Sequence, residues 1–179
     1  MAVESREKRK AKVLDVLNKA RAMELTAITQ YMNQHYNLDS MDYGEMAANM
    51  KLIAIDEMRH AEMFAERIKE LGGEPVTLGD GKVTKGQDVR AIFPFDAKLE
   101  DDTIDAYNQF LQVCRECGDN ISSTLFQTII DEEQVHFNHF DNVAGHIQNL
   151  GDAYLSRIAG TPSSTGGSTK GFALPGAGA

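Results

Sequence analysis

Two copies of a Glu-x-x-His motif constrain the fold of this chain more than any other feature. The first copy joins Glu57 to His60, and the second joins Glu133 to His136. Three residues turn an α-helix by about 300°, so both polar groups of each copy lie on one helical face. Apolar residues recur on that face at helical spacing, which places each motif in a buried stripe. Burying a carboxylate and an imidazole is costly unless a cation pairs with them, so the pattern predicts a metal site.

A single glutamate precedes each motif at the same distance. The interval from Glu24 to Glu57 equals the interval from Glu100 to Glu133, and each of the two earlier glutamates lies in an apolar stripe of its own. The chain therefore contains two half-sites with the same order of ligands, which is the ligand set of ferritin-like di-metal carboxylate bundles. We expect an all-α fold: a ferritin-like four-helix bundle with one long crossover and a short fifth C-terminal helix.

Gly and Pro residues mark the expected ends of the helices. The first helix is expected at about 6–36. The second is expected to begin at a cap, Ser40 or Asp42, and to end at Leu71. Three more are expected at about 88–116, 120–149 and 153–159. Pro94 is expected to kink or restart the third helix. We expect residues 1–159 to form the bundle and the Gly-, Ser- and Pro-rich residues 160–179 to form a flexible tail.

The segment between the second and third helices is ambiguous. Residues 75–84 place β-branched residues on both sides of an Asp-Gly turn, which locally favours a hairpin. An isolated two-stranded ribbon is only marginally stable, and a bundle of this kind needs a long connection at this point. We interpret the segment as the crossover, with extended pairing along the side of the bundle.

Composition excludes several classes of protein. The net charge of −9 disfavours a nucleic-acid partner, because phosphates attract clustered Lys and Arg. No apolar run is long enough to span a bilayer, so no membrane partner is expected. The first twelve residues lack the apolar core of a signal peptide. A cytoplasmic location is therefore expected.

The two cysteines, Cys114 and Cys117, form a Cys-x-x-Cys motif. A redox pair or half of a metal site is one interpretation. No second cysteine pair completes a four-sulfur site, and no βαβ pattern surrounds the motif. Packed thiols are the favoured interpretation.

The ligand types narrow the choice of metal. Four carboxylates and two imidazoles, with no thiolate, suit iron or manganese. We expect two ions, bridged by Glu57 and Glu133, which can bind one oxidant between them and each give one electron. The coordination of one ion is completed by Glu24 and His60, and that of the other by Glu100 and His136.

Three further side chains near the predicted site have two interpretations. Asp56 and Glu132, each one residue before a bridging glutamate, either orient the imidazoles of the ligands or are exposed helical acids. Tyr31 either lines the site or is an ordinary core tyrosine.

The chain resembles the bacterioferritins. The segments AMELTAITQY from Ala22, IDEMRHAE from Ile55 and DEEQVHF from Asp131 carry the resemblance, which covers about 12–158. Animal-type ferritins are similar in fold but lack the second histidine, so His136 favours the bacterioferritin branch. All six positions of the family's ferroxidase centre are matched, by Glu24, Glu57, His60, Glu100, Glu133 and His136.

The resemblance implies an iron-storage protein with ferroxidase activity. Such a protein binds two Fe²⁺ at an intra-subunit di-iron centre, oxidises them with O₂ or H₂O₂ and stores ferric mineral. It implies a shell of twenty-four subunits built from dimers, and an electron-donor protein for iron release is a further expected partner.

The resemblance also implies one haem at each subunit dimer interface, with a methionine from both sides as its axial ligands. Only Met58 matches that position. It lies about 100° around the helix from Glu57 and so faces away from the predicted di-iron site. Taken alone, a methionine there is more typical of an interface or a core.

The chain departs from the bacterioferritin pattern in two respects. The chain has no Trp, and His139 stands where a bulky aromatic residue is expected near the centre. His139 is either an additional ligand, part of an iron path, or a packed or surface histidine.

The main rival function is a rubrerythrin-like di-iron peroxide reductase, which normally needs a four-cysteine iron site. A di-manganese catalase, an inactive ferritin-like shell and a DNA-coating mini-ferritin are less favoured.

Overall fold

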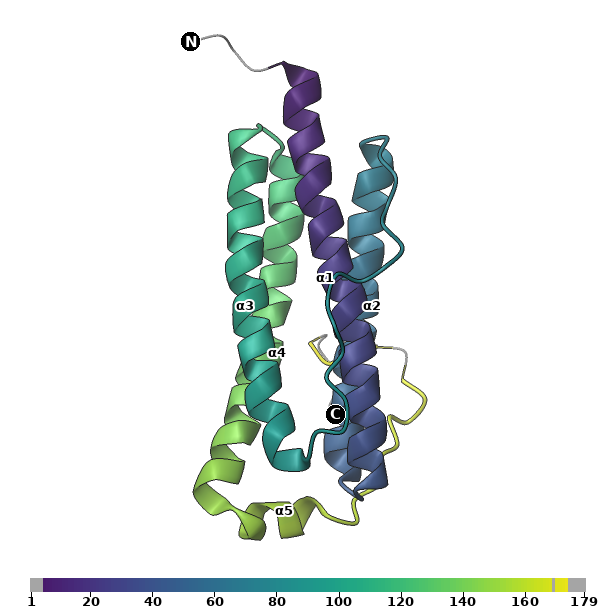
Figure 1. The fold of residues 1–179 in the computed structure, drawn as a ribbon, viewed down its shortest axis with the longest axis vertical. Helices are drawn as coiled ribbons and strands as arrows, with labels where there is room; N and C mark the ends of the chain where they lie inside the picture. Colours follow the sequence, from purple (N-terminus) through teal and green to yellow (C-terminus); the bar gives the residue numbers. More distant parts are fainter. Residues whose placement is uncertain (1–4, 169, 174–179) are drawn as a thin grey trace.

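The structure, a computed structural model, describes residues 5–168 and 170–173. Within these residues the chain forms five helices and no strand. They are α1 (Arg6–Ser40), α2 (Gly44–Glu70), α3 (Val89–Glu116), α4 (Asn120–Leu150) and α5 (Asp152–Ile158). The four long helices lie side by side as a bundle, and α5 crosses one end of it (Figure 1). The predicted all-α bundle with a long crossover and a short fifth helix is confirmed.

Residues 1–4, 169 and 174–179 lie outside the described part of the chain. They include the first residues of the predicted bundle domain and part of the predicted tail. Among the described helices, none is long and apolar enough to cross a membrane.

Several helix ends follow the local sequence signals. The Asp88 carboxylate accepts from the backbone N–H groups of Arg90 and Ala91 at the start of α3. The Asp119 carboxylate accepts from the N–H of Ser122 at the start of α4. Gly72, just past the end of α2, has a φ of 72°, which a residue with a side chain rarely adopts. Within the described residues, α3 runs through Pro94 without a restart.

The predicted connection between α1 and α2 is wrong in one respect. α1 continues to Ser40, so neither Ser40 nor Asp42 caps α2, and Tyr43 occupies the capping position without a side-chain hydrogen bond. The continuation buries Leu38 completely, which favours helix beyond the expected end. The distant Thr161 hydroxyl accepts from the N–H of Glu45 at 2.8 Å and satisfies that backbone group instead.

The segment between α2 and α3 is a crossover, as expected, but the extended pairing expected along the side of the bundle is absent from its described residues. Residues 73–87 run along α1 without pairing as strands (Figure 1). The Gln30 side-chain amide pairs with both the N–H and the C=O of Thr84, at 2.7 and 3.1 Å. The Asn18 side chain accepts from the N–H of Val76 at 2.8 Å. The backbone of the crossover is therefore satisfied by side chains of α1, and it needs no second strand.

The core consists of two apolar clusters, one on each side of a polar layer. One cluster includes Leu38, Phe93 and Phe140, and the other includes Phe64, Phe126 and Cys114. Burial raises the pKa of the Cys114 thiol to about 12, in agreement with a packed thiol. Because both clusters exclude water, charged groups in the layer between them interact through a medium of low polarity.

Candidate metal centre

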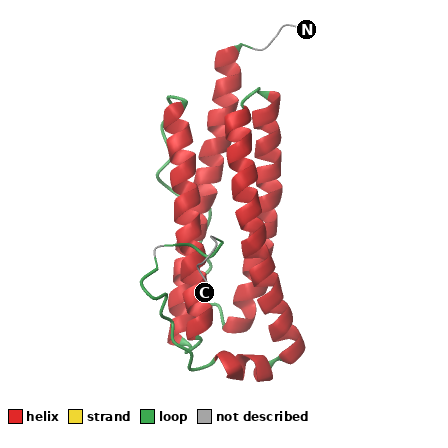
Figure 2. Ribbon diagram, turned by 180° about the vertical axis from the view of Figure 1, so that it is seen from behind, coloured by secondary structure: helices red, strands yellow, loops and turns green. Residues whose placement is uncertain are grey.

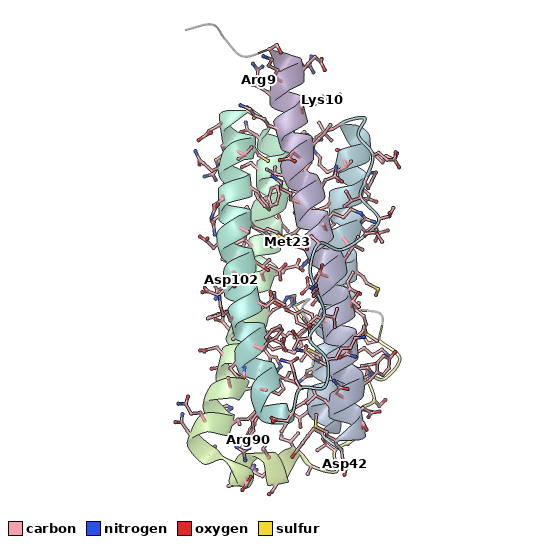
Figure 3. The ribbon with its side chains drawn as sticks, in the orientation of Figure 1. Arg9, Lys10, Met23, Asp42, Arg90 and Asp102 are labelled. Carbon is pink, nitrogen blue, oxygen red and sulfur yellow. The ribbon has the colours of Figure 1, made fainter. Side chains whose placement is uncertain are left out.

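The polar layer contains all six residues predicted as metal ligands. Each of the four long helices contributes to it, and the contribution of α1 directly follows Met23, which is labelled in Figure 3. All six residues are buried, with at most 2% of the surface of each residue exposed. Their sources are Glu24 on α1, Glu57 and His60 on α2, Glu100 on α3, and Glu133 and His136 on α4.

The six side chains divide into two overlapping groups of four. In each group, the candidate ligand atoms all lie within 4.8 Å of one another. The groups are Glu24, Glu57, His60 and Glu133, and Glu57, Glu100, Glu133 and His136. Glu57 and Glu133 belong to both groups, which is the arrangement needed for two carboxylates to bridge two ions.

The atoms that face the centre fit a pair of cations. Oε1 of Glu57 and Oε1 of Glu133 are buried without a hydrogen-bond partner among the described residues. Each of these oxygens is instead in ion-pair contact with an imidazole. Nδ1 of His60 lies 3.2 Å from Oε1 of Glu133, and Nδ1 of His136 lies 3.2 Å from Oε1 of Glu57. Carboxylate oxygens and imidazole nitrogens thus converge on one enclosed volume, as ligands of two hard-to-borderline metal ions do.

Protons balance the charge of the layer when no metal is bound. Burial, reinforced by the neighbouring carboxylates, raises the pKa of Glu24 and of Glu100 well above the ordinary value. Burial alone would lower the pKa of His60 and of His136, but the surrounding carboxylates raise both well above the ordinary value. Burial would likewise raise the pKa of Glu57, but the two imidazoles outweigh it and lower that pKa. Metal ions must therefore displace protons from several of these groups.

A second set of acids holds the outer nitrogens of the two imidazoles. Nε2 of His60 lies 3.0 Å from Glu132, and Nε2 of His136 lies 3.1 Å from Asp56. The contacts are crossed, because each acid holds the histidine of the other helix. Arg59 binds both acids, at 2.9 Å in the case of Asp56. The geometry supports the interpretation that these acids orient the imidazoles so that each Nδ1 faces the centre.

Two tyrosines complete the layer. The hydroxyl of Tyr31 donates to Glu100, and that of Tyr107 donates to Glu24 at 2.5 Å. Burial raises the pKa of both phenols well above the ordinary value, so they remain donors. Tyr31 therefore lines the site. Tyr107 was missed as a site residue, although the interval from Tyr31 to Tyr107 is the same as the interval from Glu24 to Glu100.

A cavity reaches the layer from the side covered by the crossover. It has a volume of about 190 Å³ and is lined by carboxylates of the site together with Met23, Asp80 and Lys82. Gly79 and Gly81 lie so close to Thr26 that an added Cβ would meet its side chain at 2.5 and 2.7 Å. The N–H of Gly81 donates to the Thr26 hydroxyl at 3.0 Å, which holds the crossover against α1 beside the cavity.

Met58 and His139 lie apart from the six residues. Met58 is on α2 with half of its surface exposed, so the structure leaves it outside the buried layer. His139 is half-buried, and its ring packs against the rings of Phe140 and Phe172 at 5.6 and 4.6 Å between centroids. Burial lowers the pKa of His139 to about 4, so the ring is neutral at pH 7. It belongs to neither group of candidate ligands.

We expect Glu132→Gln to weaken metal binding about 10- to 100-fold, the usual effect of losing an acid that orients a ligand imidazole. Glutamine keeps the shape of the side chain but removes the charge beside Nε2 of His60. The measurement is the Co²⁺ affinity of the metal-free protein from its visible absorption. Asp131→Asn changes the exposed neighbouring acid and serves as the control. Equal affinities in the two variants would contradict the orienting role.

Comparison with known proteins connects this geometry to one group of proteins. Residues 14–150 match the ferritin family, described as a ferritin-like domain. The chain is 68% identical over 168 residues to a bacterioferritin of Desulfovibrio desulfuricans, covering 94% of both chains. It is 33% identical over 144 residues to bacterioferritin BfrA of Mycobacterium tuberculosis, covering 80% of this chain and 91% of that protein.

Solved structures agree with this result. An X-ray structure of the D. desulfuricans bacterioferritin superposes with a TM-score of 0.91 at 67% identity, covering 95% of this chain and 99% of that one. That structure is described as showing the diiron site in different catalytic states. The M. tuberculosis BfrA structure superposes with a TM-score of 0.78 at 32% identity, covering 82% and 93% of the two chains.

Proposed function

The chain belongs to the bacterioferritin family, and we propose that its buried polar layer binds two Fe²⁺ and oxidises them for storage. Bacterioferritins are iron-storage ferroxidases. The observation that carries the proposal for this chain is the pair of overlapping ligand groups that share Glu57 and Glu133. Each of these two shared residues also has a buried carboxylate oxygen without a hydrogen-bond partner among the described residues, which a bridging cation would satisfy.

The proposed ligands are those predicted from the motif spacing. The coordination of one ion is completed by Glu24 and His60, and that of the other by Glu100 and His136. Both ions share Glu57 and Glu133. Two Fe²⁺ held together each give one electron, so O₂ with two protons yields H₂O₂, or H₂O₂ with two protons yields two water molecules. The protons that the ligands release on metal binding are set free in the same layer where the reduction of O₂ or H₂O₂ consumes protons. Tyr31 and Tyr107 hold the terminal carboxylates through hydrogen bonds from their hydroxyl groups.

The residues around the layer keep its geometry fixed during the reaction. Asp56 and Glu132 hold the outer nitrogens of the imidazoles, so neither ring turns away when iron leaves. The apolar clusters on both sides exclude water. Such preorganisation lowers the cost of reorganising the ligands as the charge of each ion rises.

Storage in a shell of twenty-four subunits built from dimers is the second part of the proposal. Near full-length similarity to bacterioferritins supports a homo-oligomeric shell. The rubrerythrin-like alternative lacks comparable support, because the chain has two cysteines and such enzymes normally need a four-cysteine iron site. An electron-donor protein for iron release and a cytoplasmic location remain predictions.

Haem binding at Met58 is the third part of the proposal. Met58 is half-exposed on α2, as expected for a thioether that meets a ligand at a subunit interface. It also faces away from the di-iron layer, so haem bound there leaves the six proposed iron ligands untouched.

Replacing Met58 with Leu should remove haem and leave iron oxidation within about twofold of the unchanged protein. Leucine is similar in volume and apolar but has no sulfur to coordinate the haem iron. The absorbance in the Soret region per subunit, after reconstitution with excess haem, measures the first effect. Retention of an unaltered haem spectrum would mean that another residue is the ligand.

Size-exclusion chromatography with light scattering tests the storage function. Absorbance of haem and iron content are read on the same peak. We expect a particle of roughly twenty-four subunits with about one haem per two subunits, the assembly that the family resemblance implies. A dimer or tetramer that holds two iron ions per chain without haem would favour the peroxide reductase.

A further inference from the structure

The described part of the C-terminal tail lies against α2 and α4, on the opposite side of the layer from the crossover. The tail leaves α5 at one end of the bundle and follows α2 toward its middle (Figure 2). Near its start, the N–H of Gly160 donates to the backbone oxygen of Asp42 at 2.8 Å, and Thr161 binds Glu45. The tail is thus attached at the start of α2 before it reaches the metal layer.

The second attachment is a contact with the acid that holds a ligand imidazole. The N–H of Ala173 donates to Oδ2 of Asp56 at 2.8 Å, and the same oxygen lies 3.1 Å from Nε2 of His136. Asp56 has a completely buried side chain. The tail therefore takes part in the hydrogen-bond network that orients His136.

The fit of the tail at this point excludes even one added carbon atom. Gly171 is buried, and a Cβ built on it would lie 1.5 Å from Oδ1 of Asp56. Asp56 has little room to retreat, because Arg59 and His136 bind its two oxygens. A glycine is needed here for close approach of the backbone, although its φ is not in the left-handed region.

The ring of Phe172 covers His136 and His139, two of the histidines of α4. Its centroid lies 4.6 Å from that of His139 and 6.5 Å from that of His136. His139 is thereby explained as a packing partner of the tail. An aromatic ring from the tail fills the space beside the ligand imidazole.

We propose that residues 171–173 form a strap that closes the α2/α4 side of the metal layer and holds Asp56 in position against His136. The strap consists of the backbone of Gly171, the ring of Phe172 and the N–H of Ala173. The effect of the strap on metal binding rests on the proposed di-iron function. The strap makes Ala173 a positioning residue for the site and makes seating of the tail a condition for tight retention of metal.

Two matched glycine-to-alanine variants of the full-length protein test the proposal. Gly171→Ala places a methyl group against Asp56 and should unseat the strap. Gly145→Ala on α4 adds the same methyl group where nothing lies within 4 Å. Circular dichroism verifies that both variants retain the helical bundle.

The first readout is cleavage by trypsin after the exposed Lys170, measured by the loss of mass of residues 171–179. A protease needs a segment free of the surface around the cleaved bond. We expect cleavage at least about tenfold faster in Gly171→Ala than in Gly145→Ala. This measurement needs no metal, so it tests seating of the strap independently of the di-iron function.

The second readout is the rate at which a chelator removes Co²⁺ loaded at two ions per chain. We expect about 10- to 100-fold faster removal from Gly171→Ala, because an outer contact of a ligand histidine is lost. Faster cleavage with unchanged removal of Co²⁺ would overturn the positioning role, and unchanged cleavage would overturn the seating itself. Failure of the original protein to bind two Co²⁺ per chain would instead contradict the proposed di-iron function.

Discussion

Replacing Glu133 with Gln should reduce the rate of Fe²⁺ oxidation by at least about 100-fold while the helical bundle stays folded. Glu133 belongs to both groups of candidate ligands, so its loss affects both ion positions at once. Glutamine retains the shape of the side chain but removes the charge that two cations share. Rapid mixing of metal-free protein with Fe²⁺ and O₂, followed by the absorbance of the ferric product, gives the rate.

Two further variants make this prediction specific. Glu57→Gln should have an effect of the same size, because Glu57 is the other shared carboxylate. Glu62→Gln changes an exposed acid on the same helix and should leave the rate within about twofold. Rapid oxidation in the Glu133 variant, at the rate of the Glu62 control, would refute the assignment of the site.

The affinity for metal should fall steeply as the pH is lowered. Glu24, Glu100, His60 and His136 all have a pKa raised above the ordinary value in the metal-free protein. At pH 6, below the ordinary histidine value of 6.5, both imidazoles carry protons that binding must displace. With two to four protons displaced, the combined affinity for two ions changes by about 100- to 10,000-fold per pH unit.

Calorimetric titration with Co²⁺ in buffers of different ionisation enthalpy counts these protons directly. We expect at least two protons released per pair of ions at pH 6, with stronger binding as the pH rises. Glu24→Gln removes one carboxyl group whose pKa is raised by burial, so any pair of ions that the variant binds should release fewer protons. An affinity independent of pH between 6 and 8 would show that these groups have already lost their protons before metal arrives.

The helix boundaries show which parts of the fold the local sequence determines. α2 ends at Glu70, within one residue of the predicted end, because Gly72 and Gly73 cannot favour continuation. α1 has no such stop and extends beyond its predicted end near Tyr36, to Ser40. The packing of Leu38 decides this end, and packing depends on residues distant in the sequence.

The crossover illustrates the same limit. Its Asp-Gly turn and β-branched residues indicate a hairpin when they are considered alone. In the folded chain, Asn18 and Gln30 of α1 supply hydrogen bonds that a second strand would otherwise provide. Those partners lie far from the crossover in the sequence, at separations of 58 and 54 positions, so no local pattern reveals them.

More of the candidate site than of the connections between helices could be predicted from the sequence, because helical spacing alone places a ligand on one face of a helix. All six predicted ligands meet in one layer. Tyr107 could have been found from the constant interval that relates the two halves of the chain. The contact of Ala173 with Asp56 could not, because it joins residues 117 positions apart and the tail has no periodic pattern.

An anaerobic titration of the metal-free protein with Fe²⁺, followed by one pulse of O₂, tests the central claim most directly. Iron bound per chain is counted before the pulse, and Mössbauer spectroscopy reports the state of the iron after it. We predict saturation at two Fe²⁺ per chain and conversion to a magnetically coupled pair of Fe³⁺, with both results lost in Glu133→Gln. Saturation at one ion per chain, or two ferric ions without magnetic coupling, would contradict a shared site bridged by Glu57 and Glu133.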